Sequence, residues 1–119
     1  MSNTVIISGN LHYLSRALQN IVQNADKYGR STIAINIECD KSNAYIHIED
    51  DGDGIPKSQW ESVFIPFSRL DESRSKDNGG YGLGLAIVRK ITTWHRGSCH
   101  VGFSELGGAK FTLTLPLAK

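Results

Sequence analysis

A row of polar side chains follows one edge of the first long helix that the sequence predicts. At ~100° per residue, Asn20, Asn24 and Lys27 lie within about 60° of one another and away from the apolar stripe of that helix. A carboxamide oxygen is a hard, neutral ligand that suits Mg²⁺, which takes few protein ligands and uses phosphate oxygens for the rest. A solvated polar face is the alternative, but other polar residues of the helix already supply that face, so the asparagine row borders the core.

An acidic stretch, Glu49–Ile55 (EDDGDGI), follows a predicted strand. A calcium loop of the helix–loop–helix kind would need alternating ligands through ~12 residues and a closing Glu, and Pro56 and Lys57 follow too early for that pattern. A carboxylate that leaves a sheet beside glycines can instead accept a hydrogen bond from the amino group of a planar ring. The missing glycine side chains let such a ring approach the backbone.

A glycine-rich run, Gly79–Leu85 (GGYGLGL), opens the second long helix. The dinucleotide-binding version of this pattern needs a preceding strand and a βαβ unit, whereas a charged loop, Ser68–Asn78, comes before it here. A flexible loop is one interpretation of the run. The other is a polyphosphate site, because free N–H groups and the helix dipole at a helix N-terminus favour anions.

The elements that must position these residues follow from hydrophobic periodicity. The segment Ile33–Glu38 alternates, which predicts a strand whose isoleucines form one buried face. Strands with one apolar face need a covering layer, so we expect one domain over residues 1–119: a two-layer α/β sandwich with a mixed, largely antiparallel five-stranded sheet and three helices on one face. The expected helices are Leu11–Tyr28, Pro56–Val63 and Leu83–Trp94, and the expected strands are Val5–Ser8, Ile33–Glu38, Tyr45–Glu49, Cys99–Phe103 and Phe111–Leu115.

Composition excludes several functional classes. Thirteen Lys and Arg against 12 Asp and Glu give a net charge of +1 in 119 residues, so the sequence predicts no nucleic-acid arm and no polybasic membrane anchor. No apolar run approaches the ~20 residues of a membrane span. Two cysteines, Cys39 and Cys99, are too few and too far apart for a disulfide framework.

The three chemical stretches occur in the order in which they occur in the ATP-binding domain of sensor histidine kinases, which the chain resembles. That family belongs to the superfamily of DNA gyrase, Hsp90 and MutL. The resemblance covers Val5 to Leu117, is closest to the branch that contains EnvZ and RstB, and implies a Bergerat-type ATP-binding fold. The matching motifs are the N box Leu18–Tyr28, the G1 box Asp50–Ile55, the F box Phe64–Leu70 and the G2 box Gly80–Val88.

The resemblance implies a site for ATP and Mg²⁺. Asp50 would bind the adenine amino group, and Asn24 would hold the metal with Asn20 nearby. Phosphates would be reached by Lys27 and Arg69, with Arg74 as a helper. The residues that would surround the nucleotide are Tyr28, Gly52, Gly54 and Ile55 at the adenine, Phe67 in the loop, and Gly80, Gly82, Leu83 and Gly84 at the phosphates.

The phosphoacceptor is expected outside this chain. None of its histidines, His12, His47, His95 and His100, lies in a phosphoacceptor-helix context. The resemblance therefore implies a fragment of a longer kinase that transfers phosphate to its own dimerisation and phosphoacceptor domain, for relay to a response-regulator receiver domain. The isolated domain would be monomeric, and the parent would be an inner-membrane sensor with this domain on the cytoplasmic side.

Three alternatives share the motifs. ATPases of the gyrase or MutL type carry a Glu four residues before the metal-binding Asn to activate water, and here that place is Asn20, which cannot accept a proton. An anti-sigma-factor serine kinase fits the F and G2 boxes less well. A module that binds nucleotide without transferring phosphate is the third alternative.

Overall fold

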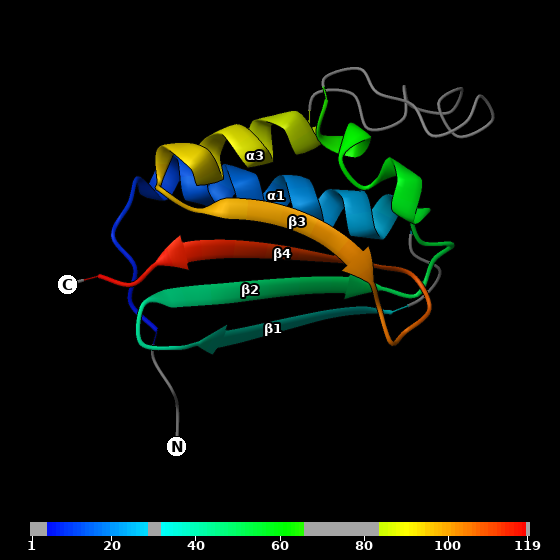
Figure 1. The fold of residues 1–119 in the computed structure, drawn as a ribbon, viewed down its shortest axis with the longest axis horizontal. Coiled ribbons are helices and arrows are strands. Elements are labelled where there is room, and N and C mark those ends of the chain that lie inside the picture. Colours follow the sequence, from blue (N-terminus) through cyan, green and yellow to red (C-terminus); the bar gives the residue numbers. More distant parts are fainter. Residues whose placement is uncertain (1–4, 29–31, 66–83, 119) are drawn as a thin grey trace.

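The computed structural model describes residues 5–28, 32–65 and 84–118, with only the backbone for residues 26–28. Figure 1 shows two α-helices packed side by side on one face of a sheet. None of the described helices is both long and apolar enough to cross a membrane. In chain order the elements are α1 (Leu11–Tyr28), β1 (Ile33–Cys39), β2 (Asn43–Asp50), the 3₁₀ turns η1 (Lys57–Gln59) and η2 (Ser62–Phe64), α3 (Gly84–Trp94), β3 (Ser98–Phe103) and β4 (Ala109–Pro116).

The sheet has the strand order β1-β2-β4-β3, and all of its neighbours are antiparallel. The β1–β2 hairpin closes at Asp40, whose Oδ1 accepts hydrogen bonds from the backbone N–H groups of Ser42 (2.8 Å) and Asn43 (2.7 Å). Such an Asx turn is the reason that Asp is favoured at this position. The predicted two-layer α/β sandwich and its hairpins are thus confirmed.

The core lies between the helices and the sheet. Alternate residues of β2 and β4 point inward, so that Ile48 and Phe111 are almost fully buried. From the helical layer, Ile21 of α1 and Val88 of α3 meet them, as the 3.6-residue period requires.

The described sheet has four strands, so the prediction of a fifth strand over Val5–Ser8 is wrong. The N-terminal segment forms only an isolated antiparallel bridge between Ile7 and Leu117. Pro116 has no N–H to offer, and the N–H of Leu117 donates to Ser42 O (2.9 Å). One further bond, from Ala118 N–H to Ile6 O (2.9 Å), is too little for a ladder.

The predicted helix over Pro56–Val63 is also wrong: the segment forms two short 3₁₀ turns, η1 and η2. Trp60, which lies between the two turns, anchors the segment. The Trp60 indole donates to Ile55 O (2.9 Å) and packs edge-on against Phe103 of β3, with ring centroids 4.9 Å apart. Tight i→i+3 bonds suit such a short, anchored connection better than continuous helix does.

The isoleucines of β1 lie on one face, as predicted, but only the first of them, Ile33, packs against the core. Ile35 and Ile37 are 54% and 59% exposed. Their register partners on β2, Ile48 and Ile46, are buried beneath the helices. β1 is the outer strand, and α1 packs on β2, so the outer strand lies beyond the helical cover.

Candidate functional site

The described candidate residues gather at one end of the molecule. Figure 1 shows the C-terminal ends of α1 and β2 beside the N-terminus of α3, at the end away from both chain termini. Pairing of Ile33 with Asp50 brings the start of β1 to the same end. Described parts of three motifs that are distant in sequence therefore lie at the same end of the molecule.

Asp50, the last residue of β2, is 2% exposed. Its Oδ1 accepts hydrogen bonds from the backbone N–H groups of Gly52 (2.9 Å) and Ala109 (3.2 Å). Among the described residues, both donors reach the same oxygen, and Oδ2 is left as an acceptor for a ligand. A buried carboxylate held by N–H donors can recognise an amino group with little reorganisation.

Glycines let the backbone come close to this carboxylate. A Cβ on Gly108 would lie 2.1 Å from Asp50 Oδ1 and 2.6 Å from the nitrogen of Gly52. Gly54 has φ +76°, a left-handed conformation that glycine adopts at low cost. The turn at Gly54 leads Ile55, which is 3% exposed, into the core.

Gly108 and Ala109 are contacts of Asp50 that sequence reasoning missed. Gly108 ends the turn between β3 and β4, which was predicted only as a connection, and Ala109 is the first residue of β4. The signal in the sequence was the Gly107-Gly108 pair directly before an alternating strand. Such a pair indicates that another part of the chain approaches the backbone closely, but it does not identify that part.

The asparagine row of α1 is half-buried, as predicted. Asn20 Nδ2 donates to the carbonyl of Gly84, the first residue of α3, over 3.4 Å. Asn24 lies one turn further along α1 and is also half-buried. The row therefore faces the start of α3, which links the N box to the G2 box.

A Cβ on Gly84, the first described residue of α3, would meet no atom of the described residues within 4 Å. The other predicted contacts lie outside the described part of the chain: the side chains of Lys27 and Tyr28, and residues Phe67, Arg69, Arg74, Gly80, Gly82 and Leu83.

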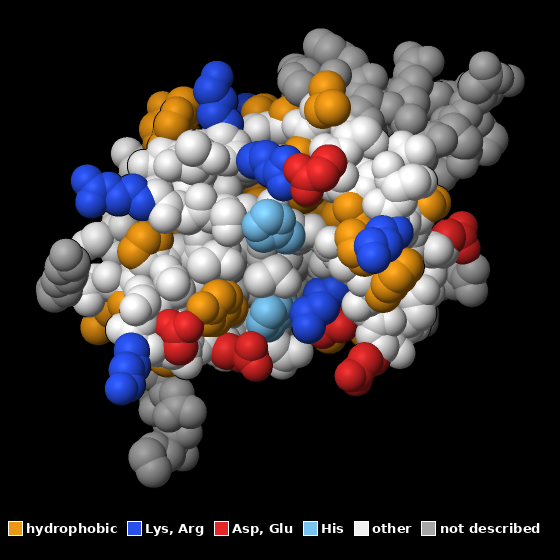
Figure 2. All heavy atoms as spheres, in the orientation of Figure 1, with side chains coloured by type: hydrophobic (Ala, Val, Ile, Leu, Met, Phe, Trp, Pro, Cys, Tyr) orange, Lys and Arg blue, Asp and Glu red, His pale blue; other side chains and the backbone are white. Residues whose placement is uncertain are grey.

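Elsewhere on the surface, positive and negative side chains lie among one another, and two pairs of described side chains are in contact. Figure 2 shows Lys and Arg side chains interspersed with Asp, Glu and His on the face toward the viewer. His47 on β2 contacts Glu38 Oε2 (3.0 Å) through Nε2 and Thr112 Oγ1 (2.9 Å) through Nδ1. Arg89 of α3 forms a second pair: its Nη1 lies 2.9 Å from Oε1 of Glu61, the residue before η2. This bond lowers the pKa of the Glu61 carboxyl below its usual value.

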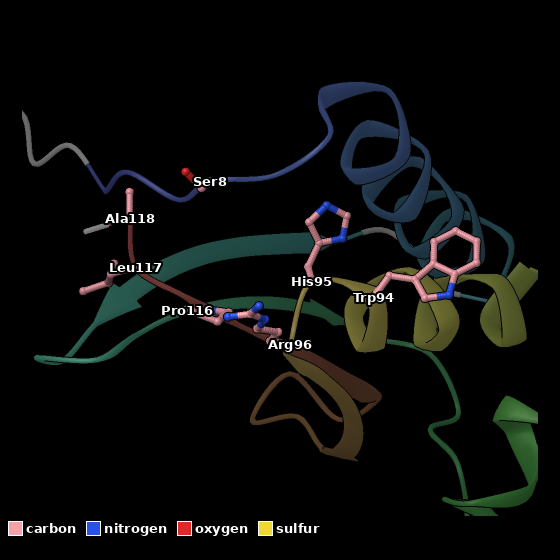
Figure 3. A pocket seen from close by; sticks show the side chains of 7 residues that line it. All are labelled: Ser8, Trp94, His95, Arg96, Pro116, Leu117 and Ala118. Atoms are coloured by element: carbon pink, nitrogen blue, oxygen red, sulfur yellow. The ribbon is translucent and has the colours of Figure 1, made fainter.

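An open hollow of about 490 Å³ lies at the opposite end of the molecule. Figure 3 shows its lining side chains, which come from the N-terminal segment, the end of α3 and the end of β4. His95 is occupied there, since its Nε2 accepts the N–H of Asn10 (3.0 Å) and its Nδ1 lies 2.8 Å from Ile91 O. The hollow carries no described carboxylate or phosphate-binding motif, and we do not assign it as the nucleotide site.

Comparison with known proteins gives a consistent result. Residues 9–119 match the family described as "Histidine kinase-, DNA gyrase B-, and HSP90-like ATPase". The chain is 42% identical over 111 residues to the sensor histidine kinase CpxA of Escherichia coli K12, which is 93% of this chain and 24% of CpxA. It is 41% identical over 107 residues to the sensor protein RstB of the same strain, which is 90% of this chain and 25% of RstB.

Among solved structures, the chain resembles the ATP-binding domain of PrrB from Mycobacterium tuberculosis. The TM-score is 0.81 at 30% identity, and the match covers 100% of this chain and 77% of that one. The similarity to RstB agrees with the predicted branch. The chain spans about a quarter of the length of the curated relatives it matches.

Proposed function

Because this chain belongs to the family of histidine kinase-, DNA gyrase B- and HSP90-like ATPases, we propose that it binds MgATP and presents the γ-phosphate to a histidine on another domain of a two-component sensor kinase. Its relatives CpxA and RstB are sensor proteins, and the match to this chain covers about a quarter of each. The acceptor domain, a downstream response regulator and a place on the cytoplasmic side of a membrane sensor are parts of the same proposal.

The observation that carries the proposal is the geometry of Asp50. Its Oδ1 is fixed by two backbone N–H groups at a strand end. Oδ2 can then accept a hydrogen bond from the exocyclic amino group of adenine, while the backbone at Gly52 and Gly54 leaves space for the ring. Ile55 is proposed to contact the ring from the core side.

The donor set near the start of α3 fits Mg²⁺ bound to a triphosphate. Asn24 would supply a carboxamide oxygen, and Asn20, whose amide donates to Gly84 O, would hold α3 in place beside it. Bound Mg²⁺ would supply charge neutralisation for the phosphate oxygens. Gly84 and the rest of the G2 box would add backbone N–H groups, with Lys27, Arg69 and Arg74 as cations.

In this reaction the chain would position the triphosphate and would not transfer a proton. A neutral imidazole nitrogen of the acceptor would attack the γ-phosphorus in line, the bond to the β,γ-bridging oxygen would break, and ADP would leave. No general base is required for that attack. Asn20, which cannot accept a proton, agrees with transfer to a side chain rather than with activation of water.

The first prediction tests the nucleotide site by titration calorimetry. We expect one MgATP per chain and a weaker affinity for Asp50→Asn by about 1–3 kcal/mol, because an amide can turn a donor toward the adenine amino group. Asp40→Asn, a matched change in the hairpin at the other end of β2, should bind as the wild type does. Equal affinities of wild type and Asp50→Asn would remove Asp50 from the site, and no binding by the wild type would refute the proposed function.

A further inference from the structure

The turn between β3 and β4, which we call the Ser104–Gly108 turn, is closed by its own hydrogen bonds. Ser104 N–H donates to Gly108 O (2.9 Å), and Gly107 N–H donates to Ser104 O (3.0 Å). The side-chain Oγ of Ser104 accepts the N–H of Leu106 (2.9 Å). Gly107, with φ +104°, takes the left-handed conformation that this turn requires. The turn is therefore a compact unit with a defined shape.

A side chain of β2 holds this unit to the sheet. The hydroxyl of Ser104, which is 9% exposed, donates to Glu49 Oε1 over 2.8 Å. Glu49 directly precedes Asp50, and successive side chains of a strand point to opposite faces. The turn is thus fixed to the residue before Asp50 on one face of the sheet.

The last residue of this turn and the first residue of β4 touch Asp50 itself. Gly108 N–H donates to the backbone carbonyl of Asp50 (3.1 Å), and Ala109 N–H donates to its Oδ1 (3.2 Å). The space between Gly108 and this carboxylate is too small for a methyl group. A shift of the turn would therefore displace Ala109, the residue that follows it, and so move one of the two N–H donors that hold Oδ1. The direction of Oδ2 would change with it.

We propose that the Ser104–Gly108 turn, anchored by the Ser104–Glu49 hydrogen bond, orients the Asp50 carboxylate and so sets the preference of the site for a 6-aminopurine. Ser104, Glu49 and Gly108 are then positioning residues that act through Asp50. The inference rests on the proposed function, because it names the part of the nucleotide that this end of the site selects.

Inosine triphosphate is a suitable probe, since it carries a carbonyl oxygen where ATP carries the amino group. A correctly oriented Oδ2 accepts a hydrogen bond from the amino group of ATP but faces another acceptor in inosine triphosphate. The wild type should bind ATP at least about tenfold more tightly than inosine triphosphate. A loosely held carboxylate loses this preference while the triphosphate contacts remain.

The experiment measures affinities for both nucleotides, with Mg²⁺, by titration calorimetry. Ser104→Ala and Glu49→Ala should each lower the ratio of the affinity for ATP to the affinity for inosine triphosphate about three- to tenfold. The affinity for inosine triphosphate itself should change little. The double variant should lose no more than Ser104→Ala alone, since the hydrogen bond that Glu49→Ala removes is already absent in Ser104→Ala. Ser104→Thr keeps the hydroxyl and should restore the preference, and Ser62→Ala, which removes a hydroxyl bonded to Gln59 in η2, is the matched control.

A second pair of variants tests the close approach. Gly108→Ala places a methyl group against Asp50 Oδ1, whereas Gly102→Ala in β3 adds one in open space. We expect the first to abolish the ATP preference and the second to keep it. Thermal unfolding of every variant separates a lost preference from a lost fold.

The outcomes distinguish the inference from the proposed function. If the wild type binds neither nucleotide, the proposed function fails. If it binds both equally, or if Ser104→Ala, Glu49→Ala and Gly108→Ala keep the wild-type ratio of affinities, the nucleotide site stands and the positioning role of the turn is refuted.

Discussion

Asp50 shows how the surroundings of a single residue make its two carboxylate oxygens different. Its two carboxylate oxygens are chemically equal in the free amino acid, yet here two backbone donors reach Oδ1. One of those donors is two residues away and the other is 59 residues away. The fold therefore makes the two oxygens different, which is what recognition of a directed amino group requires.

Cys99 is a second residue whose chemistry depends on burial. It is fully buried in β3, and burial raises the pKa of its thiol from a usual value of 9.0 to about 12. Above pH 9 the unfolded chain loses a proton that the folded chain keeps, so the stability from this group is complete below pH 9 and is lost as the pH rises toward 12. We expect the free energy of unfolding to fall by about 1.4 kcal/mol per pH unit in that window.

Urea unfolding at pH 8 and pH 10 checks this expectation, with Cys99→Ala as the comparison. Loss of the methyl-sized sulfur group lowers the stability of the variant at both pH values. Only the difference between the two pH values reports the thiol. Equal pH dependence in wild type and Cys99→Ala would contradict the prediction.

At the scale of elements, Arg89 joins three of them. From α3 its guanidinium bonds Glu61 before η2 (2.9 Å), donates to the carbonyl of Cys99 in β3 (3.0 Å) and lies 4.0 Å above the ring of Phe64 in η2. Since η1 and η2 have few internal hydrogen bonds, such contacts between elements determine where this connection lies.

Arg89→Ala should lower the free energy of unfolding by about 1–3 kcal/mol, because it leaves a buried carbonyl without its donor and removes the cation from the Phe64 ring. Chemical denaturation gives the value. Lys90→Ala, at the exposed neighbouring position of the same helix, should change stability by less than about 0.5 kcal/mol. Similar losses in the two variants would show that Arg89 does not join these elements.

At the scale of the whole molecule, the candidate site and the chain termini lie at opposite ends. The described candidate site lies at the end where α1 and β2 finish and α3 begins, and both chain termini lie at the other end (Figure 1). There the ring of His95 connects the N-terminal segment to the end of α3.

We expect the isolated chain to neither label itself nor hydrolyse ATP rapidly. It carries no histidine in an acceptor context, and Asn20 cannot activate water. Incubation with γ-labelled ATP should leave it unlabelled, and addition of the histidine-bearing domain of the parent kinase should give an acid-labile, alkali-stable label on that domain. Asp50→Asn should reduce the label, and self-labelling of the isolated chain would overturn the prediction.

The sequence alone determined the features that depend on local periodicity and on spacing along the chain. The helix Leu11–Tyr28, the β1–β2 hairpin and the strands at Cys99 and Phe111 were predicted correctly, because each has its own apolar period and turn residues. The family followed from the order of four motifs. The assignment of Asp50 to adenine came from that resemblance and stays a prediction.

Only the tertiary structure decided which elements meet. Strand order left Ile35 and Ile37 uncovered, the hydrogen bonds around Pro116 reduced Val5–Ser8 to one bridge, and contacts of Trp60 turned a predicted helix into 3₁₀ turns. The contact between the Ser104–Gly108 turn and Asp50 also depends on which strands pair in the sheet. Pairing between distant strands depends on hydrogen bonds and packing that form only when the whole sheet assembles, and no local pattern in the sequence specifies them.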